Sequence, residues 1–440
     1  MYLLRRLIDA ADGDQAKVDF SLSVLSWDSP DRAANIQRMA QSLNLPDEWG
    51  HLCYVVDFLL SHRAELLLKA KDGSLSQGEA QCTRDGAEFK SAAKKLLEGT
   101  SPEAWRLATG KMDQLFRENA NGDYLAFGQM STLKETLGGY AILPSLAANC
   151  LKDSIRTAGF AKGLFDAINV AKKTFTERPI RILYAGCGPF ATLAMIVAPF
   201  FEKGEVEFTA LDVYEASVAC ANKVAKNLGQ ADKFKEIKWG DATNYKVKGK
   251  RPHIIITETM QSQLLTEPQP QITAELGDQL EDGGIFIPQL VDVNAFAGRT
   301  EYSGIRHDPF VSDLEPIGEL FKLTPELARL VKDGNGQINM ARLTQALTVN
   351  KTLPISDRAA ELPQLIIQTR VHIFGNEWLT GNTPTGITRR IINELRIFGL
   401  VPAQIRFSYI AGQSDDIEVE ITDKRENKSN IRLRNLRKGD

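Results

Sequence analysis

The feature that most constrains the fold is a central stretch, residues 178–290, in which short apolar segments alternate with helical ones. One of these segments, RPHIIITE, is so apolar that both of its faces must be covered, as in a buried parallel strand. Three similar segments precede it, RPIRILYAGCGP, EVEFTALD and FKEIKWGDA, and helical patterns follow the first two. Strands that alternate with helices predict a doubly wound, Rossmann-like α/β sheet that is mostly parallel.

The length of the chain, 440 residues, predicts more than one domain. Residues 1–140 show helical apolar spacing without β-alternation and predict an N-terminal helical domain. Residues 141–289 contain the α/β pattern, and residues 290–440 contain β-rich pieces between turn residues, such as LIIQTRVHIFG. A helical pattern over about 313–350 interrupts this last domain.

Charge and composition argue against several kinds of partner. The formal net charge is -3, so no overall field selects nucleic acid or an anionic membrane, and we expect neither partner. No apolar run reaches the roughly 18 residues that span a bilayer, and the N-terminus lacks a signal-peptide pattern, so we expect a cytoplasmic protein. The five cysteines and five histidines are scattered without metal-ligand spacing, and we expect no metal site.

A glycine turn, YAGCGP, stands where the first strand runs into a helix. Gly186 and Gly188 flank Cys187 there, and glycine lets the backbone approach a ligand without a Cβ clash. One G-x-G alone is a weak signal, since ordinary tight turns also contain it. Asp212 strengthens the signal, because it ends the next strand, 24 residues after Gly188, where a carboxylate accepts the hydroxyls of a ribose.

The third strand also ends in an acid, with Asp241 and Ala242 in the segment GDATNY. We expect Asp241 to meet the amino group of an adenine ring. The glycine turn lacks the third glycine of a dinucleotide fingerprint and the Gly-Lys-Ser/Thr of a phosphate loop. Adenosine without a pyrophosphate therefore fits better, and the expected cofactor is S-adenosyl-L-methionine.

With these residues the sequence resembles the class I S-adenosylmethionine-dependent methyltransferases over roughly 178–290, although Tyr184 stands where that family often has an acid. The segment TETMQSQLLTE is also similar to the double-glutamate loop of the protein arginine methyltransferases, in which two glutamates nine residues apart flank a methionine. Glu258, Met260 and Glu267 reproduce these three positions. The resemblance implies that both glutamates are catalytic, that Glu258 also borders the cofactor, and that all three residues face the substrate, Met260 by packing in the pocket wall.

The resemblance extends to both sides of this loop. LKDSIRTAGFAKGLFDAI is similar to the family's helical segment before the sheet, which implies that Arg156, followed by Thr157, reaches the methionine carboxylate of the cofactor. Phe160 stands where a tyrosine is usual, and the family's Thr-His-Trp loop has no counterpart, since His372 and Trp378 lie in VHIFGNEWLTG. GGIFIPQLVDVNAFAG resembles the strand that leads into the family's β-barrel, and the helical insertion occupies the place of its dimerisation arm. These likenesses imply a barrel-like C-terminal domain and a homodimer.

Two carboxylates suit methyl transfer to a guanidine. Guanidinium is a poor nucleophile, because its lone pairs are delocalised. A carboxylate pair accepts its N–H groups, draws the positive charge onto the non-attacking nitrogens, and accepts the released proton. The leading hypothesis is an N-methyltransferase that acts on an arginine-like guanidine, or on another cationic nitrogen, of a peptide, protein or small molecule.

Other interpretations stay open at this point. Glu258 could bind only the cofactor or cap the following helix, Glu267 could be a plain loop residue, and Arg156 could pair with Asp153 on its own helix. The missing Thr-His-Trp loop and the unusual N-terminal helices also allow an O-, C- or carboxyl methyltransferase of natural-product or peptide modification. A third alternative is a non-catalytic binding module that keeps the cofactor fold.

Overall fold

The computed structural model describes residues 78–122, 133–301, 310–381, 385, 387–393, 402–423 and 431–433. The chain divides into two compact units, Met1–Gln81 and Cys82–Asp440, and nearly all described residues belong to the second. The helices that the sequence predicts before residue 78 lie outside the described residues. Among the described helices, none is long and apolar enough to cross a membrane.

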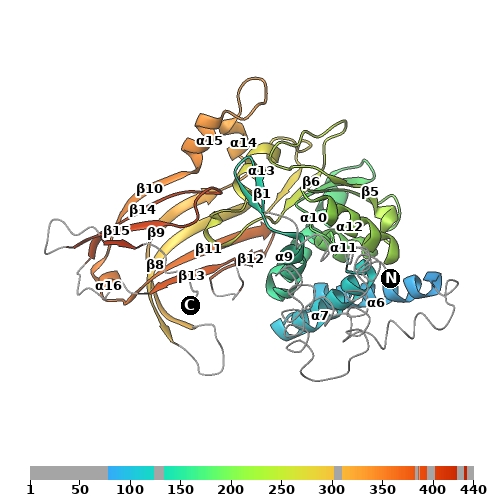
Figure 1. Cartoon of the computed structure of the whole chain (residues 1–440), viewed down its shortest axis with the longest axis horizontal. Helices are drawn as coiled ribbons and strands as arrows, with labels where there is room; N and C mark the ends of the chain where they lie inside the picture. Colours follow the sequence, from blue (N-terminus) through green and yellow to red (C-terminus); the bar gives the residue numbers. More distant parts are fainter. Residues whose placement is uncertain are drawn as a thin grey trace, which may run out of the picture. The chain divides into compact units, whose positions relative to one another are not determined.

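A five-stranded parallel sheet forms the α/β part of the second unit (Figure 1). Its strands, in chain order, are β3 (Ile180–Ala185), β4 (Val206–Asp212), β5 (Phe234–Trp239), β6 (Ile254–Thr257) and β7 (Ile285–Ile287). They lie side by side in the order β5-β4-β3-β6-β7, with every pair parallel. This is the Rossmann-like order, which reverses direction between β3 and β6. The predicted doubly wound α/β sheet is confirmed.

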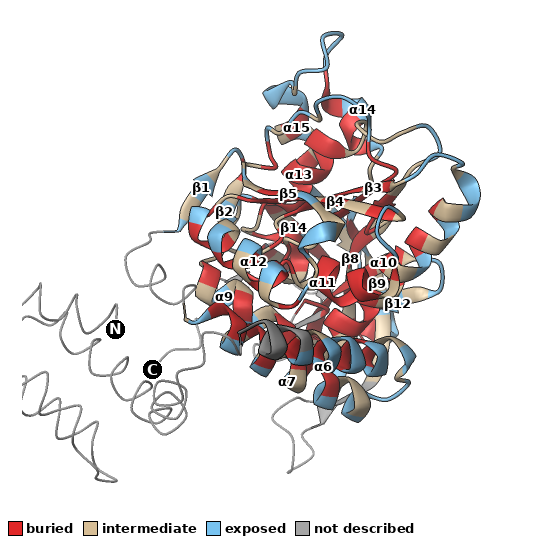
Figure 2. Cartoon of the chain, turned by 90° about the vertical axis from the view of Figure 1, so that its right-hand side faces the viewer, coloured by how far each residue is buried: buried red, intermediate tan, exposed pale blue. Residues whose placement is uncertain are grey.

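Both faces of this sheet are covered, which explains why β6 is apolar throughout. Leu183 and Ile255 belong to a small core on one face, together with residues of α13 (Gln269–Leu276). Ile254, the neighbour of Ile255 along the strand, belongs instead to the main core with residues of α10 (Ser154–Thr174). Figure 2 shows β3 and β4 as mostly buried strands, with the buried α13 beside them. Two more helices contribute to the main core, α11 (Thr192–Val197) and α12 (Glu215–Asn227).

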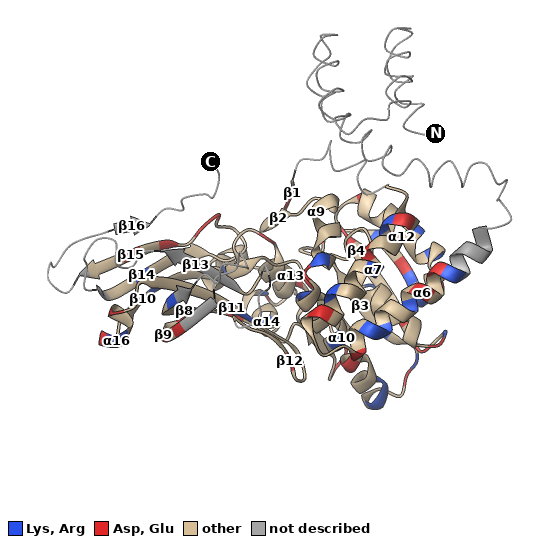
Figure 3. Cartoon of the chain, turned by 90° about the horizontal axis from the view of Figure 1, so that it is seen from below, with Lys and Arg blue, Asp and Glu red and all other residues tan. Residues whose placement is uncertain are grey.

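Two further helices, α6 (Gly78–Glu98) and α7 (Pro102–Ala120), pack on the α/β part. Ser101 is the N-cap of α7, and its side chain accepts a backbone N–H of the first turn. The fully buried ring of Phe116 stacks on Phe190, with the ring centroids 4.9 Å apart. The outer faces of both helices carry charges of both signs (Figure 3). Because α7 contacts α10 and α12, it belongs to the same compact unit as the sheet, whereas the sequence predicts a boundary near residue 140.

The C-terminal part is antiparallel and contains two sheets. The first sheet is formed by β8 (Leu290–Glu301), β9 (Phe310–Leu323), β11 (Gln364–Phe374), β12 (Glu377–Leu379) and β13 (Arg389–Asn393). The second sheet is formed by β10 (Thr348–Pro354), β14 (Pro402–Ile410), β15 (Glu418–Asp423) and β16 (Ile431–Leu433). The predicted β-rich C-terminal region is confirmed.

The helical insertion is shorter than the sequence predicts. Helix is expected from about residue 313, yet β9 continues to Leu323, because its backbone pairs with β8 along nearly its whole length. Pairing with a long neighbouring strand overrides the local helical spacing of this segment. Helical structure in this region is limited to α14 (Leu327–Val331) and α15 (Met340–Leu347), and a single turn, α16 (Asp357–Ala360), follows β10.

Phe116→Ala tests whether α7 is part of the folded unit that carries the sheet. Because Phe116 is fully buried against Phe190, its truncation should lower the free energy of unfolding by about 3–5 kcal/mol. Leu107→Ala is the control, because Leu107 is 60% exposed on the same helix, and it should change stability by no more than about 0.5 kcal/mol. Urea unfolding followed by circular dichroism measures both. Equal stabilities of the two variants would contradict the packing of α7.

Candidate active site

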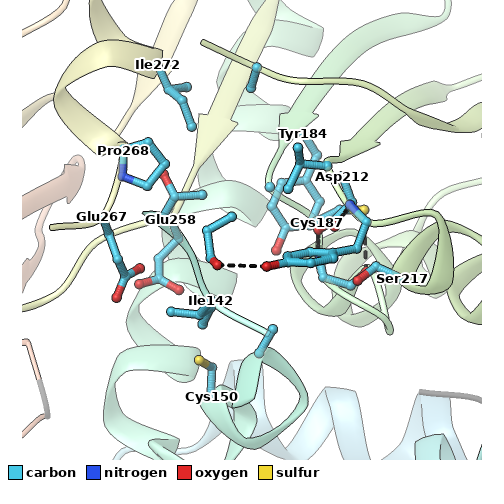
Figure 4. Close-up of a pocket in the computed structure, with 18 of the residues that line it drawn as sticks. Ile142, Cys150, Tyr184, Cys187, Asp212, Ser217, Glu258, Glu267, Pro268 and Ile272 are labelled. Atoms are coloured by element: carbon cyan, nitrogen blue, oxygen red, sulfur yellow. Dashed lines mark hydrogen bonds between the residues drawn. The ribbon is translucent and has the colours of Figure 1, made fainter. Parts of the chain in front are cut away.

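A pocket is lined by the residues that follow β3, β4, β5 and β6 (Figure 4). It lies at the reversal of strand order between β3 and β6, which is where open α/β sheets bind ligands. The sequence-predicted cofactor and catalytic residues that line it are Arg156, Gly186, Cys187, Gly188, Asp212, Asp241, Ala242, Glu258 and Glu267. The structure thus brings together side chains that are separated by up to 111 positions along the chain.

The glycine turn after β3 requires residues without a side chain. Gly186 and Gly188 have φ angles of +74° and +67°, in the left-handed region that glycine adopts most readily. A Cβ at Gly186 would lie 2.2 Å from Cγ2 of Thr259, whereas at Gly188 the nearest atom would be 3.7 Å away. The N–H groups of Gly186 and Cys187 both donate to the carbonyl of Leu211 at 2.9 Å. These two bonds hold the turn against the end of β4.

The aspartates at the ends of β4 and β5 shape the loops around them as well as lining the pocket. Oδ2 of Asp212 accepts from the N–H of Gly188 and Oδ1 from the N–H of Tyr214, both at 2.9 Å. Burial raises the pKa of Asp212, and these hydrogen bonds partly offset the rise. Oδ1 of Asp241 accepts from the N–H and the hydroxyl of Thr243, at 2.9 and 2.7 Å. A carboxylate has about four acceptor positions, so each aspartate has room for ligand donors as well.

Arg156 lies in the first turn of α10 and connects this helix to the end of β6. Its Nη1 donates to Oε1 of Glu258 and its Nη2 to the carbonyl of Cys150, each at 3.3 Å. The carboxylate of Asp153, the N-cap of α10, lies 3.6 Å from Nε. Burial by itself lowers the pKa of Arg156, but the nearby Glu258 and Asp153 raise it overall, so the guanidinium stays charged. The contact with Asp153 that the sequence allows is present, and the contact with Glu258 is one that the sequence does not predict.

Glu258 and Glu267 lie side by side and point into the same part of the pocket (Figure 4). Burial raises the pKa of both carboxyl groups to about 7. For Glu258 the positive charge of Arg156 works against this rise, and for Glu267 the negative charge of Glu258 adds to it. With both groups ionised, this end of the pocket carries more negative than positive charge, because one guanidinium faces two glutamates and Asp153.

The double-glutamate loop, residues 258–267, contains two consecutive residues with left-handed backbone angles, Gln263 (φ +61°) and Leu264 (φ +55°). Such angles cost about 1–3 kcal/mol each in residues other than glycine and persist only where the surroundings hold them. The N–H of Gln263 donates to Oγ1 of Thr369 at 2.8 Å, and the N–H of Gly412 donates to the carbonyl of Leu264 at 2.7 Å. The antiparallel part of the chain therefore holds the second half of this loop.

Met260 lies elsewhere than the sequence predicts. The resemblance places it in the substrate-facing wall, but it does not line the pocket, and the residue is 2% exposed within the main hydrophobic core. The physical reason is that an unbranched thioether gains more from apolar packing than from a place among carboxylates. The motif spacing does not determine to which side of the loop this residue points.

One side of the pocket comes from a hairpin that the sequence patterns do not predict, β1 (Lys134–Thr136) and β2 (Gly139–Ala141). The hydroxyl of Tyr214 donates to the last carbonyl of β2 at 3.0 Å, and the N–H of Tyr140 donates to the carbonyl of Thr266 at 2.8 Å. The hairpin therefore connects the end of β4 to the double-glutamate loop. The residues from this segment that line the pocket are Thr136, Ala141 and Ile142.

The residues that depart from the arginine methyltransferase pattern lie partly in the pocket and partly outside it. Tyr184 and Phe160 are buried and line the pocket. His372 and Trp378 stack on each other in the β11–β12 hairpin, with ring centroids 4.2 Å apart, and do not line it. Among the described lining residues, no His-Trp pair takes the place of the family's Thr-His-Trp loop.

Comparisons with known proteins give structural matches. The PRMT1 enzyme–prozyme heterotetrameric complex of Trypanosoma brucei with AdoHcy has 13% sequence identity and a TM-score of 0.43, over 66% of this chain and 98% of that chain. A uniquely open structure of Arabidopsis thaliana protein arginine methyltransferase 10 has 10% identity and a TM-score of 0.40, over 65% of this chain and 95% of that chain. No family model and no curated protein matches the sequence. The chemistry proposed for the pocket therefore rests on its own residues.

Alanine at Gly186 and at Gly188 should have unequal effects. Both positions have positive φ, so each substitution brings a backbone strain of about 1–2 kcal/mol. A Cβ at position 186 would clash with Cγ2 of Thr259 at 2.2 Å, whereas at position 188 the nearest atom lies at an ordinary contact distance of 3.7 Å, so Gly186→Ala should lower the free energy of unfolding more than Gly188→Ala. Denaturant unfolding of the two variants and the wild-type chain measures this difference. A Gly188→Ala variant as unstable as Gly186→Ala would disprove the described contact.

Proposed function

We propose that the chain is an S-adenosyl-L-methionine-dependent N-methyltransferase that acts on a guanidine or another cationic nitrogen. The observation that carries this proposal is the pair of half-buried carboxylates, Glu258 and Glu267, at one end of a pocket whose other end is the glycine turn with Asp212. Transfer of a methyl group from a nucleoside donor to a cationic acceptor requires one pocket that binds both molecules. Here one end of the pocket suits a cation and the other end suits a nucleoside. The acceptor is a peptide, a protein or a small molecule that carries such a nitrogen.

The residues present fit the proposed cofactor. Gly186 and Gly188 leave the space that a Cβ would otherwise occupy, so the backbone can approach an adenosine closely. Asp212 is the last residue of β4 and Asp241 follows the adjacent strand β5, and the two supply acceptors for the ribose hydroxyls and the adenine amino group. The positive guanidinium of Arg156 suits the carboxylate of the methionine moiety. The cofactor supplies an electrophilic methyl group on a sulfonium, and the chain supplies position and charge.

The glutamates suit a cationic acceptor. Glu267 and the part of Glu258 that Arg156 leaves available accept the N–H groups of a guanidinium and hold its attacking nitrogen toward the donor. A bond forms between this nitrogen and the methyl carbon while the sulfur–carbon bond breaks. The nitrogen then releases a proton, and a carboxylate with a pKa of about 7 can accept it at neutral pH.

Glu267→Gln should separate acceptor chemistry from donor binding. The substitution keeps the size of the side chain but removes its charge, so turnover should fall by about 10²–10⁴-fold, while binding of S-adenosylhomocysteine in calorimetry stays nearly unchanged. Glu135→Gln is the control, because it removes the same charge from an exposed position of the hairpin.

Methyl transfer is measured with S-adenosyl-L-methionine that carries a labelled methyl group, and mass spectrometry locates the methyl in the product. Undiminished turnover of Glu267→Gln would refute the carboxylate pair. A methyl group on oxygen or carbon would instead support the alternative methyltransferase classes. Failure of the wild-type chain to bind S-adenosylhomocysteine would support a non-catalytic module.

The pH dependence follows from the two raised pKa values. Only ionised carboxylates hold a cation, so kcat/KM should rise as the pH passes through about 7 and level off above it.

The folded-state pKa of these groups lies above their ordinary value of 4.5, so the stability linked to them is present at low pH and is lost as the pH rises through about 7. Initial rates and melting temperatures between pH 5 and pH 9 measure both trends. Glu267→Gln should weaken the stability loss, and a kcat/KM that falls through this window would contradict the assignment.

A further inference from the structure

One side chain ties the two ends of the double-glutamate loop together. Gln269, the first residue of α13, is fully buried, and its Oε1 accepts from the N–H and from the hydroxyl of Thr259, each at 3.0 Å. The hydroxyl of Thr257 donates to the same oxygen at 3.4 Å. Glu258 is the residue between these two threonines, and Glu267 stands two positions before Gln269. A single amide oxygen therefore fixes the backbone beside both carboxylates.

The same contact extends to the glycine turn. Thr259 places its Cγ2 beside Gly186, where an added Cβ would lie only 2.2 Å away. Thr259 is therefore held between the glycine turn on one side and the amide of Gln269 on the other. Any movement of Thr259 changes the separation between the donor end of the pocket and Glu258, the residue directly before it.

The amide of Gln269 is itself oriented by its neighbours. Its Nε2 donates to Oγ1 of Thr273 at 3.5 Å, and the Thr273 hydroxyl donates to the backbone carbonyl of Gln269 at 2.9 Å. An amide has a donor end and an acceptor end, and only the oxygen can accept from the N–H of Thr259. The bond to Thr273 thus directs the acceptor end toward the loop.

We propose that Gln269 is a positioning residue of the methyl-transfer site. It does not line the pocket; it sets the places of Glu258 and Glu267 relative to each other and to the glycine turn. This inference rests on the proposed function. In-line transfer depends on the placement of the reacting atoms, and a misplacement of about 1 Å can cost roughly 10²-fold in rate. Loss of the amide oxygen should therefore affect turnover far more than donor binding.

Gln269→Met removes the hydrogen-bond acceptor of the side chain but keeps the length of the side chain. With labelled S-adenosyl-L-methionine and an arginine-containing peptide that the wild-type chain methylates, kcat should fall by about 10–100-fold, while KM for the donor changes by less than about threefold. Gln271→Met is the matched control. Gln271 lies in the same helix and is equally buried, but its amide atoms make no hydrogen bond and it does not line the pocket. This control should keep both constants.

Gln269→Glu separates positioning from folding. The variant keeps an acceptor oxygen for Thr259 and adds a negative charge close to Glu258. We expect kcat to recover toward the wild-type value at high pH, and the midpoint of the pH profile to move upward, because a neighbouring like charge raises the pKa of a carboxyl group. A purely structural role of Gln269 predicts neither the recovery nor the shift, and the absence of both would overturn the proposal.

A measurement that needs no methyl acceptor completes the test. Amide hydrogen exchange of the segment 257–267 should be faster in Gln269→Met than in the wild-type chain and in Gln271→Met, because the N–H of Thr259 loses its partner. If the wild-type chain methylates no peptide, protein or small molecule that carries a cationic nitrogen, the proposed function fails, and the exchange rates still decide the role of Gln269. Unchanged exchange in Gln269→Met, or a kcat equal to that of the wild-type chain, would overturn the positioning role.

Discussion

The ion pair between the buried Arg156 and the half-buried Glu258 is the contact on which the arrangement of the pocket depends. It joins the first turn of α10 to the end of β6, so the helix that covers one face of the sheet is fixed at the edge where ligands bind. A buried charge is costly unless its partner is close and hydrogen-bonded, and removal of either partner would leave the other uncompensated. Glu267, placed beside this pair, leaves the pocket with an excess of negative charge, which only a proton or a cation offsets. Burial is the main cause of the pKa of about 7 at each glutamate, and at Glu267 the negative charge of Glu258 adds to the rise.

The parallel sheet could be predicted because its signals are local. Each strand is a short apolar segment followed by a turn residue or a helix, and the uninterrupted isoleucines of β6 already require cover on both faces. Strand β9 could not be predicted in the same way, since its hydrogen bonds are with β8 and its own residues have a helical spacing. The β1–β2 hairpin has strands of only three residues, and its place depends on bonds to Tyr214 and Thr266, which lie far away in the sequence.

The residues of the candidate site also include some whose positions could be predicted from the sequence and some whose positions could not. Gly186, Asp212 and Asp241 lie at the carboxyl ends of parallel strands, and these ends meet at one edge of the sheet, so their convergence follows from the pattern alone. A spacing of nine residues does not say that Glu267 returns to the side of Glu258, because the path of a loop depends on what holds it. Here that information lies in side chains outside the motif, such as Gln269 and Thr369. The position of Met260 differs from the expected one for the same reason, since a place in the motif does not define which side of the loop faces the pocket.

The two ends of the pocket consequently depend on different parts of the chain. The glycine turn and the aspartates are held by hydrogen bonds within the parallel sheet and its loops. The double-glutamate loop is held by α13 through Gln269, by β11 through Thr369, by the turn after β14 through Gly412 and by the hairpin through Tyr140. Its two left-handed residues persist only while these contacts remain. Changes in the antiparallel sheets can therefore alter the position of the carboxylates while the glycine turn keeps its hydrogen bonds to the end of β4.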